Sequence, residues 1–138
     1  MFEGLAEARK VLELAYKEVE VFHRDGELLR LRNACEKGWL AIILATDALL
    51  TRYGFKKPES YKERREFLRE LERRYHEVAE LGLRDRFGAR GYYLHILGYH
   101  EGALSEDEVV EELKKVEKYI SDVEKLLRRC SISKNSVL

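Results

Sequence analysis

Hydrophobic side chains recur every three or four residues along most of the chain, and this spacing predicts helices almost throughout. The first segment carries one apolar stripe about six turns long, formed by Leu5, Ala8, Leu12, Ala15, Val19 and Phe22. Asp25 and Gly26 should end this helix, because glycine readily adopts the left-handed conformation that closes one. A second helix is expected from about Glu27 to Tyr53, and its apolar half, residues 38–50, should be the most buried part of the fold.

Two capping boxes, in which a serine precedes a glutamate by three residues, mark the starts of later helices. Ser60 with Glu63 opens a third helix, which we expect to continue to about Leu81. Its inner stripe is predicted to consist of Tyr61, Leu68, Leu71, Tyr75 and Val78. Ser105 with Glu108 opens the last helix, whose apolar stripe is Val109, Leu113, Val116, Ile120, Val123 and Leu127.

A shorter helix is expected between these two, from about Asp85 to Ala103, although four glycines lie in or beside it. They are Gly88, Gly91, Gly98 and Gly102. Because glycine weakens an exposed helix interior by about 1 kcal/mol, the cluster indicates either tight packing against a neighbour or an irregular, functional segment, and both readings stay open. Since every connection is short, neighbouring helices should run antiparallel. We therefore expect an all-α fold: an up-and-down antiparallel bundle of four to five helices in residues 1–129, followed by a flexible tail at 130–138.

The amino-acid composition limits the classes of partner that this protein is expected to bind. The 138 residues include 26 basic and 26 acidic side chains, and this balance argues against a protein that coats long duplex DNA. Glutamine is absent and asparagine occurs only at Asn33 and Asn135, a composition typical of proteins from hot environments. The apolar run from Trp39 to Leu50 is too short to cross a membrane. We expect a cytoplasmic protein, with Cys35 and Cys130 reduced or paired, a point that the sequence leaves open.

Candidate chemistry gathers in residues 83–102, which are rich in arginine, tyrosine and histidine. The guanidinium groups of Arg86 and Arg90 suit phosphate, and His95 suits acid/base work at neutral pH. On a regular helix Tyr92, His95 and Tyr99 share one face, where the tyrosines could stack on bases, whereas Tyr93, Leu97 and His100 define another. The alternative is that His95 is a packed histidine and that Tyr92 and Tyr99 are core or interface aromatics.

Arg90 and His95 lie roughly 140° apart around a regular α-helix. They can converge only if the helix is irregular near Gly91 or if a second subunit completes the site. Asp47 is a lone carboxylate in an apolar helix and should meet a cation, because buried charges are costly unless paired. Either Asp47 or Glu36 could orient Arg90 or His95; the alternative for Asp47 is a structural ion pair with another arginine.

Neither a metal nor a cofactor is predicted. Glu72, His76 and Glu80 share one face, but the surrounding Glu, Arg and Lys favour a solvated face with ion pairs one turn apart. No phosphate-binding loop, dinucleotide fingerprint or zinc-finger spacing occurs in the sequence.

The segment Arg90-Gly-Tyr-Tyr-Leu-His95 resembles the motif of the HEPN superfamily, an arginine followed after four to six residues by a histidine. Residues 5–27, 32–50 and 94–127 also resemble the first, second and closing helices of HEPN proteins, so that the likeness covers residues 4–128. The chain is similar in particular to archaeal PaREP-type HEPN-like families. At Gly91 it differs from the ribonucleases of the superfamily, which commonly carry a polar residue there.

The resemblance implies a metal-independent endoribonuclease or RNA-binding domain, in which Arg90 holds the scissile phosphate and His95 is the acid/base. It further implies a homodimer with both sites at the seam, and a partner protein that is an antitoxin or a nucleotidyltransferase. The alternative function is a non-catalytic interaction or scaffold bundle that has kept the fold and lost the site.

Overall fold

The computed structural model describes the backbone of residues 2–137 and the side chains of residues 2–129. Within this range the chain forms six α-helices, one π-helix and no strands, so the predicted all-helical class is confirmed. The elements are α1 (Glu3–Asp25), α2 (Leu28–Arg52), α3 (Tyr61–Arg74), α4 (His76–Leu81), α5 (Leu83–Arg90), the π-helix η1 (Gly91–His100) and α6 (Glu106–Val137). The tail predicted for residues 130–138, with Cys130, lies outside the residues whose side chains are described.

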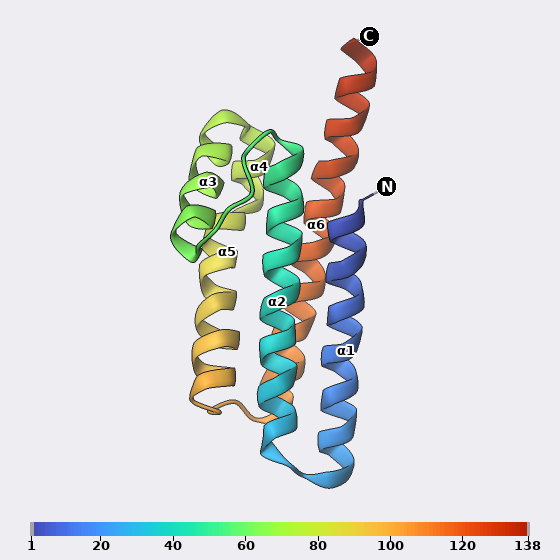
Figure 1. Ribbon diagram of the computed structural model, residues 1–138, viewed down its shortest axis with the longest axis vertical. Helices are drawn as coiled ribbons and strands as arrows, with labels where there is room; N and C mark the ends of the chain where they lie inside the picture. The colour runs from blue at the N-terminus through green and yellow to red at the C-terminus, as the bar shows by residue number, and fades with distance from the viewer. Residues whose placement is uncertain (1, 138) are drawn as a thin grey trace.

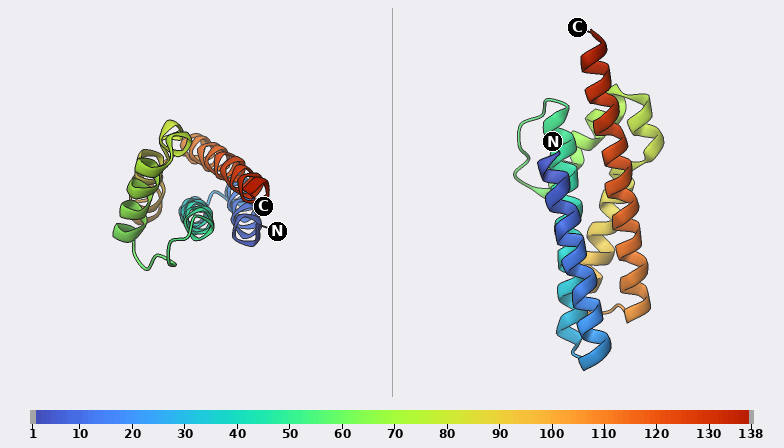
Figure 2. Two further views of the ribbon diagram at one scale, coloured as in Figure 1. Left: turned by 90° about the horizontal axis from the view of Figure 1, so that it is seen from above. Right: turned by 90° about the vertical axis from the view of Figure 1, so that its right-hand side faces the viewer.

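Helix α2 is the centre of the molecule. It contacts α1, α6 and η1, and seen from above it lies between α1 and the group formed by α3, α4 and α5 (Figure 2). The long helices stand side by side, and the short helices α3 and α4 lie at the end where α2 finishes (Figure 1). None of the helices within the described range combines the length and the apolarity needed to cross a lipid bilayer.

The apolar stripes predicted for α1 and α6 lie in the core, except that Phe22 of the first stripe is only partly buried. In α1, Leu5, Ala8, Leu12, Ala15 and Val19 are buried, and every member of the predicted α6 stripe is buried. Both capping boxes form as well: the Ser60 hydroxyl accepts a hydrogen bond from the Glu63 amide at 3.1 Å, and the Ser105 hydroxyl accepts one from the Glu108 amide at 3.3 Å. Gly26 ends α1 with a φ of 70°, in the left-handed conformation expected of it.

The third predicted helix is divided in two. Tyr75 adopts an extended conformation, with φ −129° and ψ 114°, and separates α3 from α4. The predicted inner stripe was wrong for Tyr61 and Tyr75, which are exposed, and right for Leu68, Leu71 and Val78, which are buried. The break changes the register between the two helices, and the Tyr75 ring packs edge-on against Tyr53 at 5.0 Å between centroids instead of entering the core.

The fourth predicted helix also divides, because its second half is a π-helix. Residues 83–90 are α-helical, whereas η1 is wound more widely, and at its end the Glu101 amide donates to the Ile96 carbonyl oxygen five residues back. Gly98 faces α2 so closely that an added Cβ would lie 2.8 Å from Cβ of Cys35. At this position the open question about the glycines is resolved in favour of tight helix packing.

Candidate functional site

The π-helix brings two histidines together. The Nε2 atoms of His95 and His100 are 3.2 Å apart, and the two rings meet edge to face with centroids 4.5 Å apart. Residues five apart would point in different directions on an α-helix, but a π-helix returns to nearly the same direction after that interval. The prediction that His100 lies on a different face from His95 was wrong for this reason.

Glu36 on α2 fixes the orientation of His95. Its Oε1 lies 2.7 Å from Nδ1 of His95, and both side chains are about one-third exposed, at 37% and 33%. An ionised carboxylate can only accept a hydrogen bond, so Nδ1 carries the proton. In neutral His95 the lone pair is then on Nε2, which accepts a hydrogen bond from Nε2–H of His100. The Glu36 carboxylate thus holds neutral His95 in one tautomer.

Arg32 holds the end of η1 in place. Its Nε donates to the carbonyl oxygen of Tyr99 at 2.7 Å, and its Nη2 donates to that of His100 at 2.9 Å. The last carbonyls of a helix lack partners within the helix, so these two bonds fix the turn that carries His100. Sequence reasoning missed this role, although Arg32 lies one α-helical turn before Glu36 and therefore on the same side of α2.

Two aromatic rings lie near the His95 ring. The Tyr99 ring stacks near it at 6.1 Å and an interplanar angle of 19°, and the Trp39 ring lies 6.3 Å away. Tyr92 lines the same cavity as His95 and is 52% exposed. Among the candidate residues, Glu36, Tyr92 and Tyr99 thus lie in the immediate surroundings of His95.

Arg90 lies elsewhere. Its Nε donates to Oε1 of Glu112 on α6 at 2.8 Å, and the two side chains are only 8% and 9% exposed. The guanidinium also lies over the Tyr93 ring, 5.9 Å from its centroid. Within the described residues no hydrogen bond or ion pair joins Arg90 to His95, and the two line different cavities. A single chain therefore does not bring together the arginine and the histidine of the motif.

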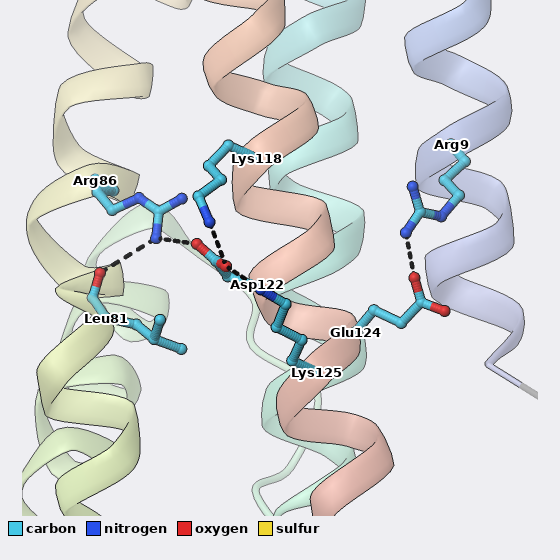
Figure 3. A network of polar contacts seen from close by, with 7 residues as sticks. All are labelled: Arg9, Leu81, Arg86, Lys118, Asp122, Glu124 and Lys125. Atoms are coloured by element: carbon cyan, nitrogen blue, oxygen red, sulfur yellow. Dashed lines mark hydrogen bonds and ion pairs between the residues drawn. The ribbon is translucent and has the colours of Figure 1, made fainter.

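Arg86 belongs to an ion-pair network on the α6 side (Figure 3). Its Nη1 donates to Oδ2 of Asp122 at 2.9 Å and to the Leu81 carbonyl oxygen at 3.2 Å, while Lys118 Nζ donates to Oδ1 of Asp122 at 3.0 Å. Burial acts to raise the pKa of Asp122, but the hydrogen bonds from Lys118 and Arg86 outweigh it and hold that pKa below its ordinary value. Arg86 supports the packing of α5 on α6 and does not contact His95.

Comparison with known proteins assigns the chain to a family. The model of the archaeal PaREP1/PaREP8 family matches residues 4–120. The chain belongs to this family. No curated protein matches the chain, and no solved structure does so either. The part matched by the PaREP1/PaREP8 model extends from α1 into α6 and includes Glu36, His95 and His100.

The remaining candidates of this PaREP1/PaREP8 protein are structural. Asp47 forms a two-point ion pair with Arg64 of α3, with Nε–Oδ1 and Nη2–Oδ2 distances of 2.8 and 2.9 Å, and contacts neither Arg90 nor His95. His76 pairs with Glu80 at 2.6 Å, and Glu72 accepts from the Arg84 amide at 3.1 Å. In the described part of the chain no three His, Cys, Asp or Glu side chains are placed to hold a metal ion.

Proposed function

We propose that this chain is a HEPN-like up-and-down bundle that binds RNA and cleaves it without a metal, with His95 as its acid/base. One observation carries the proposal: the Glu36 carboxylate, 2.7 Å from Nδ1 of His95, directs the basic Nε2 toward a partly exposed surface beside a second histidine. Histidine is the side chain best suited to accept and donate protons at pH 7, because its pKa in free solution lies close to neutral.

The reaction that fits these groups is transesterification. When RNA binds, Nε2 of His95 exchanges its hydrogen bond from His100 for one from a ribose 2′-hydroxyl. Nε2 then takes the proton of that hydroxyl, and the resulting oxygen attacks the adjacent phosphorus. The bond from phosphorus to the 5′-oxygen then breaks, and that oxygen takes a proton from protonated His100. The products are a 2′,3′-cyclic phosphate and a free 5′-hydroxyl, and no water or redox partner is consumed.

Pairing of two copies is part of the same proposal, and so is a partner protein of the antitoxin or nucleotidyltransferase class. Tyr92, Tyr93 and Ile96 are large side chains that are exposed on η1, next to His95. Exposed aromatic and aliphatic groups that lie together are typical of interaction surfaces.

The test is cleavage of a single-stranded RNA by the purified protein in the presence of EDTA, over a range of temperatures. We expect the wild type to cleave, and His95→Ala to lose about 10²- to 10⁴-fold in rate, the usual contribution of an acid/base group. His76→Ala is the matched control, because His76 is an exposed histidine on α4 whose partner is Glu80. Cleavage that stops with EDTA, or that is equal in His95→Ala and wild type, would contradict the proposal.

A second function, a non-catalytic scaffold, is favoured by the position of Arg90. Arg90 is nearly buried and forms an ion pair with Glu112, so this residue of the motif stabilises the fold. If no RNA is cleaved by any variant, while the folded protein binds a partner protein, the scaffold function holds and the ribonuclease proposal fails.

A further inference from the structure

An aromatic cavity of about 630 Å³ lies directly beside His95, between α2, the start of α3 and the α5–η1 segment. Its walls include the rings of Trp39, Tyr61, Phe87 and Tyr92, and His95 forms part of its lining. Small-molecule sites in proteins are typically apolar clefts of roughly 300 to 1,000 Å³ with a few polar groups. The cavity therefore has the size and the lining of a ligand site.

The rings form one continuous surface. Tyr61 stacks on Phe87 with centroids 5.3 Å apart and an interplanar angle of 29°, and Phe87 lies 5.1 Å from Trp39. Gly91 keeps the cavity open, because a Cβ there would lie 3.1 Å from Cη2 of Trp39 and 3.3 Å from Cε2 of Tyr61. Any larger residue would press against the two rings.

The position of Tyr61 is determined by its neighbours in sequence. The Ser60–Glu63 capping box begins α3 at this residue, and the Glu63 carboxylate also accepts a hydrogen bond from the Glu59 amide at 2.8 Å. The Tyr61 side chain is exposed at the edge of the cavity although its ring packs on Phe87. An exposed, fixed aromatic ring beside an open cavity is available to stack on a planar ligand.

We propose that this cavity binds a nucleobase, with a purine preferred over a pyrimidine. The proposal rests on the proposed function for the identity of the ligand: if a ribose next to His95 is the substrate, its base must occupy a neighbouring site, and His95 lines this one. Base stacking on aromatic side chains tolerates all four bases but grows with the ring area in contact. Polar groups of Glu59, Ser60 and Arg64 line the same cavity and can meet the edge of the base.

Binding can be measured apart from cleavage, because Trp39 is the single tryptophan of the chain and lies in the cavity wall. The experiment titrates the full-length protein with adenosine monophosphate, cytidine monophosphate and ribose 5-phosphate, and follows tryptophan fluorescence. A 2′-O-methyl oligoadenylate is titrated as well, because it is an RNA-like strand that lacks the reactive hydroxyl and therefore cannot be cleaved. We expect saturable quenching by the two nucleotides, tighter for the purine, and none by ribose 5-phosphate.

Tyr61→Ala should weaken nucleotide binding about tenfold, since stacking contributes at that level for each base. Gly91→Ala should weaken it as well, by filling the space between the Trp39 and Tyr61 rings. Tyr75→Ala is the control, an exposed tyrosine at the α3–α4 break that packs on Tyr53 and should leave binding unchanged. Circular dichroism melting of each variant separates lost binding from lost folding.

The outcomes separate the two proposals. If nucleotides bind in both wild type and His95→Ala but no RNA is cleaved, the base site stands and the ribonuclease fails. If RNA is cleaved in EDTA but no nucleotide quenches Trp39, or folded Tyr61→Ala binds as the wild type does, the base site is overturned. It is also overturned if the Trp39 signal changes with protein concentration and no nucleotide alters that change, because a second copy then fills the cavity instead of pairing beside it.

Discussion

The carboxylate of Glu36 on α2 and the imidazole of His95 on η1 meet at 2.7 Å across 59 residues of sequence. This contact defines which ring nitrogen of neutral His95 carries the proton, namely Nδ1.

The first prediction follows from that contact. Nitrogen-15 chemical shifts of the histidine rings should show His95 protonated on Nδ1 in the neutral form of the wild type. In Glu36→Ala the acceptor is lost, and the Nδ1 tautomer should no longer dominate. His76, which is on α4, should give the same shifts in both proteins. A wild-type His95 protonated mainly on Nε2 would contradict the orientation described for this pair.

The second prediction concerns Arg90 and Glu112. Because both side chains are nearly buried, Arg90→Ala leaves the Glu112 carboxylate with only the exposed Lys115 ammonium, 3.5 Å from its Oε2, and should lower the free energy of unfolding by about 2 kcal/mol. The double variant Arg90→Met with Glu112→Leu should recover most of this loss, since an apolar pair of similar volume avoids the buried charge. Chemical denaturation measures all three proteins.

Lys62→Ala is the control for that series, because its ion pair with Glu66 is well exposed and should change stability by less than about 0.5 kcal/mol. If Arg90→Ala is as stable as the wild type yet cleaves RNA poorly, Arg90 acts on the phosphate and its structural task is minor. That result would also favour a site completed by a second copy.

The helices themselves could be predicted from the sequence, because apolar periodicity and capping are local properties. The stripe from Leu5 to Val19, the Gly26 end of α1 and the two capping boxes are all present. The charge on Asp47 predicted a cationic partner, and Arg64 supplies it from α3. Which arginine would do so depends on how α3 packs against α2, and the sequence holds no local signal for that.

The site could be predicted only in part, because it depends on a change of helical pitch. The five-residue interval between His95 and His100 separates them on an α-helix and joins them on η1. The glycines at 91 and 98 indicated either tight packing or an irregular segment, and they could not predict a π-helix. Tyr119 shows the same limit: it is fully buried, and its hydroxyl lies 2.6 Å from that of Thr46, a contact that no spacing within α6 reveals.

The third prediction concerns acid stability. The pKa of Asp122 is lowered in the folded chain, so its stabilising contribution is complete above the unfolded-state pKa of about 3.9. That contribution is lost as the pH falls through the lower folded-state value. Asp122→Asn should cost about 2 kcal/mol at pH 7, where Arg86 and Lys118 lose their shared partner. Once the pH is below that folded-state value, the stability of Asp122→Asn should approach that of the wild type.

Urea denaturation between pH 7 and pH 2 measures this convergence. Glu20→Gln, on the exposed side of α1, is the matched control and should run parallel to the wild type across the range. A constant difference between Asp122→Asn and wild type at every pH would mean that the carboxylate charge is not what stabilises this network.

The fourth prediction uses two glycines in the same segment that differ in their surroundings. An added Cβ at Gly98 would lie 2.8 Å from Cβ of Cys35 and 3.2 Å from the Tyr93 carbonyl oxygen, whereas at Gly88 the nearest atom is the Tyr61 hydroxyl at 3.7 Å. Gly98→Ala should therefore destabilise the protein by about 2 kcal/mol, because η1 must move away from α2. Gly88→Ala should instead stabilise it by about 0.5 to 1 kcal/mol, since alanine is the better residue in a helix interior.

If close packing, and not backbone freedom, requires a glycine at position 98, the melting temperature should fall in Gly98→Ala and rise in Gly88→Ala. Thermal denaturation of the two variants measures this difference.

The same variants test whether the packing of η1 on α2 affects the site. Because Gly98 lies between His95 and His100 on η1 and against α2, Gly98→Ala should lengthen the Glu36–His95 contact and shift the His95 ring signals. Gly88→Ala, which precedes η1, should leave those signals in place. Equal melting shifts in the two variants would mean that α2 and η1 are not held at the close distance on which the histidine–glutamate pair depends.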